Sequence, residues 1–150
     1  MGINGELQGF FGSTRGIRQG GPLSPYLYVL VMDVLSMIIA KKVNESENFS
    51  FHWRCDRTRT THLCFADDLL LFCGGSVQAV STLKEAHMDF FLLSGMSANH
   101  AKSTLFIAGD NENLRGEISS LFGLALARCQ FDTLGFHSSP LDSQLLIARC

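Results

Sequence analysis

The chain has 150 residues, which is enough for one domain with a modest core. Its apolar share of 46% and its aromatic share of 10% are typical of a globular protein and exclude a disordered chain. Twelve basic and fourteen acidic residues give a formal net charge of -2, which argues against a stand-alone nucleic-acid binder, because such proteins are basic.

The cysteines and the apolar runs indicate the cellular setting. The five cysteines are odd in number and form no C-x-x-C pair, a pattern typical of a reducing environment. The first residues lack the basic and apolar regions of a signal peptide. The longest apolar stretch, Tyr26 to Ala40, is interrupted by Asp33 and is shorter than the ~20 residues that a bilayer requires. We therefore expect an intracellular protein of the nucleus or cytoplasm that is not secreted and has no membrane partner.

The first third of the chain predicts a hairpin, a loop and one long helix. Ile3 to Gly12 has an Asn-Gly turn near apolar residues, as in a short β-hairpin. Arg15 to Pro25 is rich in glycine and proline and predicts an irregular loop. Ser24 and Pro25 suit a helix start, and we expect the helix to run from about Pro25 to Lys42. Because this helix is apolar nearly all round, we expect it to be buried between layers.

The next segment alternates weakly from Phe49 to Trp53, as a strand does, and then carries three arginines in a turn-like sequence. For Arg54, Arg57 and Arg59 an exposed charged loop is favoured over a phosphate contact, and both interpretations stay open. Further along, the patterns predict a hairpin, a helix capped by Ser76, a strand and a short helix, at Leu63–Cys73, Val77–Leu93, Thr104–Ala108 and Glu112–Phe122.

The predicted hairpin presents two adjacent carboxylates. Cys64 to Cys73 has the sequence C-F-A-D-D-L-L-L-F-C, in which two apolar arms flank Asp67 and Asp68. Two neighbouring negative charges repel, and a fold tolerates them poorly unless a positive charge lies nearby. A divalent cation that prefers oxygen ligands, such as Mg²⁺, meets this need. A solvated acidic turn is the alternative interpretation of this segment taken alone.

Three segments in order extend the pattern: R-G-I-R-Q-G-G-P-L-S-P-Y-L-Y-V-L, L-C-F-A-D-D-L-L-L-F and S-G-M-S-A-N-H-A-K-S. Together they resemble the palm of reverse transcriptases of non-long-terminal-repeat (LINE-type) retrotransposons, in the style common in plants. The resemblance covers roughly Ile3 to Gly109. It implies an α+β fold, an incomplete polymerase palm in which an antiparallel sheet with a catalytic-type β-hairpin packs on helices, followed by a disordered or irregular C-terminal tail.

The resemblance also implies site residues and a mechanism. Asp67 matches the metal-binding Asp of the family's F/Y-x-D-D motif, and Asp68 matches its less directly bound partner. The implied chemistry is template-directed nucleotidyl transfer with two Mg²⁺ ions. Lys102 resembles a lysine proposed to assist the departing pyrophosphate, although a solvated turn lysine explains it equally well.

The glycine-rich loop implies contacts with nucleic acid. Gln19 and Gly20 match the loop that lies against the templating base and the incoming nucleotide, where a side chain would crowd the substrate. Arg15 and Arg18 either face phosphate or anchor the loop through carbonyl groups. The implied partners are an RNA template, a DNA primer and deoxynucleotides, with no small-molecule cofactor.

Two departures from the family pattern affect the expected activity. The chain has Q-G-G-P where the family usually has Q-G-D-P, so that Gly21 replaces an Asp. The family's site also needs an Asp on a strand before the hairpin at Ile3, and the chain begins after that point; neither Glu6 nor Asp33 is suitably placed to replace it. We therefore expect a fragment of an RNA-directed DNA polymerase that is inactive alone. The alternatives are a non-catalytic retroelement relic and a small interaction or nucleic-acid-binding module.

We expect two parts: residues 1–126, a partial palm, and residues 127–150, a divergent and frameshifted tail. The tail lacks a clean period from Phe131 onward, and its Ser-rich part lacks an apolar face. Codon degeneracy allows Asp132 to Gln144 to be encoded so that a shifted frame gives Tyr-Leu-Gly-Phe-Pro-Leu, a segment typical of the family at this point. We expect such a tail to be mobile, because it buries too little apolar surface to offset its ordering entropy.

Overall fold

The structure is a computed structural model that describes residues 2–3, 6–7, 20–66, 68–99, 101–108, 112–123, 125–127 and 144–148. It has an α+β fold built on a five-stranded sheet in the order β3-β4-β7-β5-β6. The strands are β3 (His62–Phe65), β4 (Asp68–Gly74), β5 (Thr104–Ala108), β6 (Ala125–Ala127) and β7 (Gln144–Ala148). All pairs are antiparallel except β5 with β6. A separate pair, β1 (Gly2–Ile3) and β2 (Glu6–Leu7), forms the short hairpin expected near Ile3.

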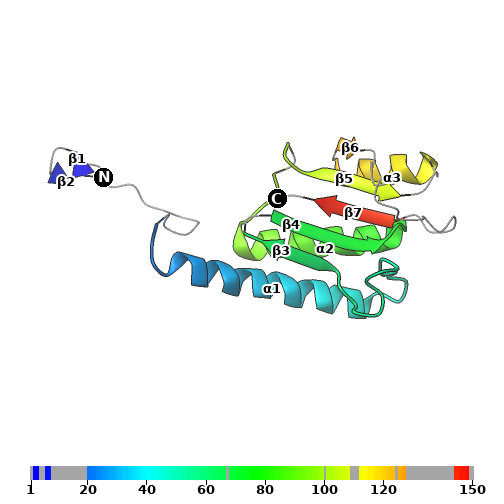
Figure 1. The fold of residues 1–150 in the computed structure, drawn as a ribbon, viewed down its shortest axis with the longest axis horizontal. Coiled ribbons are helices and arrows are strands. Elements are labelled where there is room, and N and C mark those ends of the chain that lie inside the picture. The colour runs from blue at the N-terminus through cyan, green and yellow to red at the C-terminus, as the bar shows by residue number, and fades with distance from the viewer. Residues whose placement is uncertain are drawn as a thin grey trace.

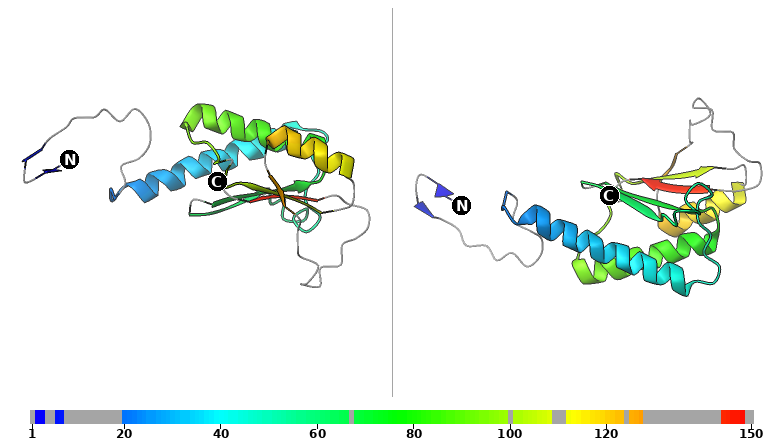
Figure 2. Two further views of the ribbon diagram at one scale, coloured as in Figure 1. Left: turned by 90° about the horizontal axis from the view of Figure 1, so that it is seen from above. Right: turned by 60° about the horizontal axis from the view of Figure 1, so that its bottom comes forward.

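Three helices cover one face of the sheet: α1 (Ser24–Glu45), α2 (Val77–Ser94) and α3 (Glu112–Phe122) (Figure 1, Figure 2). Local sequence sets the ends of α2, since the Ser76 side chain accepts a hydrogen bond from the Ala79 N–H at 3.2 Å and Gly95 ends the helix with a φ of 72°. In the described part of the chain, no helix is long and apolar enough to cross a membrane.

The core lies between the helices and the sheet. Along β4 the side chains alternate, so Leu69, Leu71 and Cys73 are buried beneath the helices while Asp68, Leu70 and Phe72 lie on the opposite face. The other principal core side chains come from the three helices and β5: Leu35, Ile39, Val43, Val80, Leu83, Phe90, Leu105, Ile107 and Ile118. The sheet thus has one face closed by helices and one that no described helix covers (Figure 2).

Helix α1 differs from the expectation that it is buried between layers. It buries only one stripe, Leu35, Ile39 and Val43, against the sheet and α2. Apolar side chains on its other faces stay exposed, including Tyr26 at 71% and Val29 at 65%. An apolar sequence shows which side chains are able to be buried, whereas burial itself requires a partner on each face.

Two other expectations also need correction. The segment from Phe49 to Trp53 forms no strand and belongs to a loop between α1 and β3. The expected irregular tail does not hold for Gln144–Ala148, because this segment is β7 and pairs with β4 on one side and β5 on the other. Backbone pairing on both sides stabilises a short apolar run that has no helical or alternating period of its own. Residues 128–143 and 149–150 lie outside the described residues.

Candidate active site at the hairpin tip

The β3-β4 hairpin is closed by a two-residue turn. Phe65 pairs with Asp68, so only two positions separate the paired strands, and Asp68 is the first residue of β4. Ala66 has a φ of 50°, the left-handed conformation that primed hairpin turns require at their first central residue. For a residue with a Cβ this conformation is strained, and such strain tends to occur at functional sites. The predicted hairpin is therefore confirmed, while Asp67 itself lies outside the described residues.

Helix α1 holds this turn in place. The Tyr28 hydroxyl donates a hydrogen bond of 2.8 Å to the Ala66 carbonyl oxygen. Further along α1, the Ser36 Oγ atom lies 2.8 Å from Nε2 of His62, at the beginning of β3. These two contacts join α1 to both ends of β3. They therefore fix the position of the hairpin turn relative to α1.

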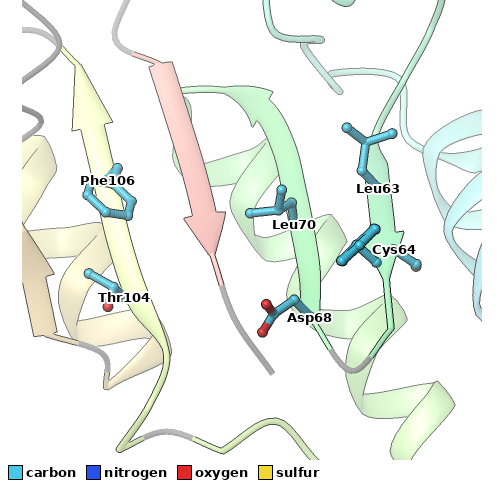
Figure 3. A pocket seen from close by; sticks show the side chains of 7 residues that line it. Leu63, Cys64, Asp68, Leu70, Thr104 and Phe106 are labelled. Carbon is cyan, nitrogen blue, oxygen red and sulfur yellow. The ribbon is translucent and has the colours of Figure 1, made fainter.

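A pocket of about 720 Å³ opens beside the tip, on the face of the sheet away from the helices (Figure 3). Asp68 is the one charged side chain among the described residues that line the pocket. It is half-exposed and lies at the beginning of β4. Apolar and weakly polar side chains from β3, β4 and β5 form the remaining walls: Leu63, Cys64, Phe65, Leu70, Thr104 and Phe106. Apolar walls around a single carboxylate suit a ligand that has both a flat apolar part and a charge.

The topology brings Lys102 to the same end of the sheet as Asp68. Because β4 and β5 both pair antiparallel with β7, they run in the same direction, and Leu70 and Thr104 pair with the same residue, Ala148. Asp68 precedes Leu70 by two residues, and Lys102 precedes Thr104 by two. Lys102 therefore precedes β5 at the same end of the sheet at which Asp68 begins β4, and one strand, β7, lies between β4 and β5.

Lys102 is exposed and lies in a turn that leads into β5. The backbone N–H groups of Lys102 and Ser103 both donate to the Asn99 carbonyl oxygen, at 3.0 and 2.9 Å, and the Ser103 hydroxyl donates to the same oxygen at 2.8 Å. The Asn99 side chain accepts from the Ala101 N–H at 3.1 Å. This hydrogen bonding fixes the backbone from which the lysine side chain extends.

Of the site residues predicted in the glycine-rich loop, the structure describes Gly20 alone. Arg15, Arg18 and Gln19 lie outside the described residues. Gly20 is described, has a φ of 76° and is exposed before α1, but it does not line the pocket. Side-chain-bearing residues rarely adopt this φ, so a glycine is favoured here for its backbone conformation, whereas the expected contact with substrate stays a prediction.

Sequence reasoning missed several residues that shape the site. Tyr28 contacts the turn across 38 positions, and Thr104 and Phe106 reach the pocket from a strand that is not adjacent to β4. The sequence offers one weak signal, the Tyr28 hydroxyl in a largely apolar stretch, because such hydroxyls usually find a hydrogen-bond partner.

The donor chemistry fits a divalent cation in part. Asp68 supplies hard carboxylate oxygens, and Asp67, adjacent in sequence, has the same chemistry. The strands beside β4 have the sequences H-L-C-F and Q-L-L-I-A and add no carboxylate. Among the described residues, no group of three or more His, Cys, Asp or Glu side chains is placed to hold a metal ion.

Comparisons with known proteins identify the family. The sequence profile described as "Reverse transcriptase (RNA-dependent DNA polymerase)" matches residues 1–138. An uncharacterized mitochondrial protein of Arabidopsis thaliana is 33% identical over 111 residues, which cover 71% of this chain and 87% of that protein. The retrovirus-related Pol polyprotein from the type-1 retrotransposable element R2 of Popillia japonica is 36% identical over 89 residues, 59% of this chain. That from the type-2 retrotransposable element R2DM of Drosophila melanogaster is 32% identical over 92 residues, 61% of this chain.

The matched regions span 12% and 8% of the two Pol polyproteins, and no solved structure matches significantly. The family profile covers most of the chain, including the hairpin, α1 and the turn before β5. The chain therefore belongs to the reverse transcriptase (RNA-dependent DNA polymerase) family, as a fragment of the kind found in non-long-terminal-repeat retrotransposons.

Proposed function

We propose that this chain is the part of a reverse transcriptase palm that presents Asp67 and Asp68 to Mg²⁺ in template-directed nucleotidyl transfer. The observation that carries the proposal is the position of Asp68 at the strained tip of the hairpin, on the open face of the sheet and facing a pocket with apolar walls. The family acts on an RNA template and a DNA primer and uses divalent metals, and the proposal extends these partners to the protein of which this sequence is part.

The described residues support the carboxylates by positioning. One face of the sheet packs against the helices, and Tyr28 donates a hydrogen bond to the carbonyl oxygen of Ala66, the residue before Asp67 in the sequence. A divalent cation bound at these carboxylates would stabilise the charge that develops on a transferring phosphate. The role of the protein is to hold the oxygens in place before substrate arrives, so that little reorganisation is needed during the reaction.

The remaining site residues have proposed roles that follow the family pattern. Lys102 lies at the same end of the sheet as Asp68, where its ammonium group would attract the phosphates of a nucleotide. Gln19 and Gly20 would lie against the template base and the incoming nucleotide, with Arg15 and Arg18 near phosphate. Their support is the order of the segments and the family match over residues 1–138.

We also propose an intracellular, reducing setting. Cys55, Cys64 and Cys73 are free thiols in the structure. Cys73 is fully buried in the core, and burial raises the pKa of its thiol to about 12, so that it stays protonated and behaves as a small apolar side chain.

Binding of Mn²⁺, a spectroscopically visible substitute for Mg²⁺, tests the proposal. We expect the 150-residue chain to bind Mn²⁺, and we expect Asp67→Asn and Asp68→Asn each to weaken the binding at least about tenfold, because removing one charged ligand from so small a donor set leaves few oxygens. Asp33→Asn, which removes an exposed carboxylate from α1, is the matched control and should leave the affinity unchanged. Electron paramagnetic resonance of free Mn²⁺ measures all four proteins, and equal affinities would contradict the proposal.

The same preparation tests the expectation that the isolated chain is inactive. The strands that flank β4 add no carboxylate to Asp67 and Asp68, and two ions about 4 Å apart need more protein oxygens than these two side chains provide. We therefore expect no primer extension on a primed RNA template with either Mg²⁺ or Mn²⁺. Extension that disappears in Asp67→Ala would show that the carboxylates of this chain suffice.

A further inference from the structure

The loop between α1 and β3 gathers aromatic and basic side chains that the proposed active site does not use. We name residues 49–60 the aromatic–arginine loop. It contains the chain's one tryptophan, Trp53, together with two phenylalanines, a histidine and three arginines: Phe49, Phe51, His52, Arg54, Arg57 and Arg59. Asp56 is its one acidic residue, so the loop carries an excess of positive charge in a chain whose net charge is -2.

The loop has a defined shape. The Cys55 N–H donates to the His52 carbonyl oxygen at 2.7 Å, and the Thr60 N–H donates to the Cys55 carbonyl oxygen at 3.2 Å. At its two ends the loop is attached to β4, because Gly74 N–H donates to Ser50 and Phe72 N–H donates to Thr61, both at 2.7 Å. A surface held in this way loses little conformational entropy when it binds a ligand.

Two of the arginines lie against aromatic rings of the same loop. The Arg54 guanidinium lies 4.6 Å from the centre of the Trp53 ring, and the Arg59 guanidinium lies 5.2 Å from the centre of the Phe51 ring. The Trp53 and His52 rings are stacked with centres 6.3 Å apart. Trp53 is nevertheless 50% exposed, so part of a large flat ring faces solvent beside positive charge.

The loop is continuous with the face of the sheet that carries Asp68. The His52 ring lies 6.5 Å from the Phe72 ring, edge to face. Phe72 alternates onto the same side of β4 as Leu70 and Asp68, and it is four residues, or about 13 Å, from Asp68. The loop therefore lies at the end of β4 away from the turn (Figure 1), at a distance that a few nucleotides would span.

We propose that the aromatic–arginine loop binds a single-stranded segment of nucleic acid, with a base stacked on Trp53 and phosphates held by Arg57 and Arg59. Flat aromatic rings combined with arginines are the chemistry by which proteins bind single strands without sequence preference. This inference deepens the proposed function, on which its place relative to Asp68 rests. The alternative, a charged loop whose arginines only cover its own rings, is an outcome of the test.

Fluorescence measures the proposed contact directly, since Trp53 is the one tryptophan of the chain. The full chain is titrated with an oligodeoxythymidylate or an oligouridylate of about 12 nucleotides, within the range of single-strand site sizes. We expect quenching of Trp53 by at least one of the two strands and an affinity that falls as salt is raised. The buffer contains EDTA, so the result does not depend on metal binding at Asp67 and Asp68.

Variants separate stacking from charge. Anisotropy of a labelled oligonucleotide should show that Trp53→Ala weakens binding at least about fivefold, while Trp53→Phe, which keeps an aromatic face, weakens it less. Arg57→Gln should lower the slope of log affinity against log salt by about 0.7, the value for one phosphate contact on a single strand. Lys41→Gln is the matched control, because Lys41 is an exposed cation on α1 whose pairing with Glu45 contributes little.

The outcomes are distinguishable from those of the Mn²⁺ experiment. Quenching together with a larger effect of Arg57→Gln than of Lys41→Gln supports the loop, even if Mn²⁺ binding fails. Absence of quenching overturns the loop proposal and leaves the proposed function standing if Asp67 and Asp68 still bind Mn²⁺. Equal effects of Arg57→Gln and Lys41→Gln also overturn it. Circular dichroism of every variant confirms that the fold is retained.

Discussion

At the residue scale, His62 uses both nitrogens of its ring: one contacts Ser36 on α1, and the other contacts the neighbouring residue Thr61. Nε2 lies 2.8 Å from Ser36 Oγ, and Nδ1 lies 3.1 Å from Thr61 Oγ1. The Ser36 hydroxyl already donates to the Met32 carbonyl oxygen at 3.2 Å, so we infer that Nε2–H donates to Ser36 and Nδ1 accepts from Thr61. The neutral ring satisfies every partner, and burial lowers the pKa of His62 below its ordinary value of 6.5.

This arrangement predicts that the fold loses stability in mild acid. Below about pH 6.5 the unfolded chain binds a proton on His62, whereas the folded chain, with its lower pKa, does not. The free energy of unfolding therefore decreases as the pH is lowered, until the pH reaches the pKa of His62 in the folded state. Urea unfolding at about pH 7.5, 6.5 and 5.5 measures the effect. His62→Gln should show a weaker fall than the natural chain, and parallel pH profiles for the two proteins would contradict the assignment.

The residues proposed to carry chemistry have a stronger local signal in the sequence than the residues that position the hairpin. Asp67 and Asp68 stand out in the sequence because two adjacent carboxylates interrupt an apolar run. The strained Ala66 and its partner Tyr28 do not, because an alanine gives no sign of a positive φ and the hydrogen bond joins residues 38 positions apart. A local pattern records the properties of a side chain, whereas its partner depends on how distant elements pack.

At the element scale, α1 is apolar on more faces than it buries. Leu35 is 1% exposed and belongs to the buried stripe, whereas Leu30, on the same helix, is 62% exposed. The helix also packs along α2, where the Lys42 ammonium lies 3.1 Å from Asp89 and 3.6 Å from Glu85. The hydrogen bond with Asp89 is the main cause of a raised pKa of Lys42, which keeps this cation charged.

The two leucines give a matched test of this packing. Leu35→Ala should lower the free energy of unfolding by about 2–5 kcal/mol, because it leaves a cavity between α1, α2 and the sheet. Leu30→Ala removes the same atoms from an exposed position and should change it by no more than about 0.5 kcal/mol. Urea unfolding of the two variants decides the point, and equal losses would mean that the orientation of α1 described here is wrong.

The elements with a strong local signal were predicted well. The hairpin, α2, β5 and α3 lie within a few residues of their expected bounds, because turn residues, caps and periodicity coincide in each of them. Strand β7 was missed. Its five residues, Q-L-L-I-A, form a short apolar run that is equally compatible with a strand and with a helix. Its two partner strands are distant in the sequence.

At the scale of the whole molecule, β7 completes the sheet by joining the hairpin to β5 and β6. The family resemblance implies that a strand with a further carboxylate lies beside the hairpin, yet the strand that pairs with β4 here has no acidic residue. The boundary at residue 127 and the frameshift stay predictions, which the coding DNA would decide. The α+β fold itself was predictable, because the order of the apolar helices and strands and the resemblance to the family both indicate helices packed on a sheet.

The central claim is that the hairpin of this chain presents the metal-binding carboxylates of a reverse transcriptase. Its most direct test is to replace the corresponding hairpin of an active reverse transcriptase with His62–Gly74 and to measure DNA synthesis on a primed RNA template. We expect the graft to support synthesis and Asp67→Ala within it to reduce synthesis at least about 100-fold, since both metal positions depend on that carboxylate. A folded, template-binding graft that is inactive with both aspartates intact, or equally active without Asp67, would contradict the claim.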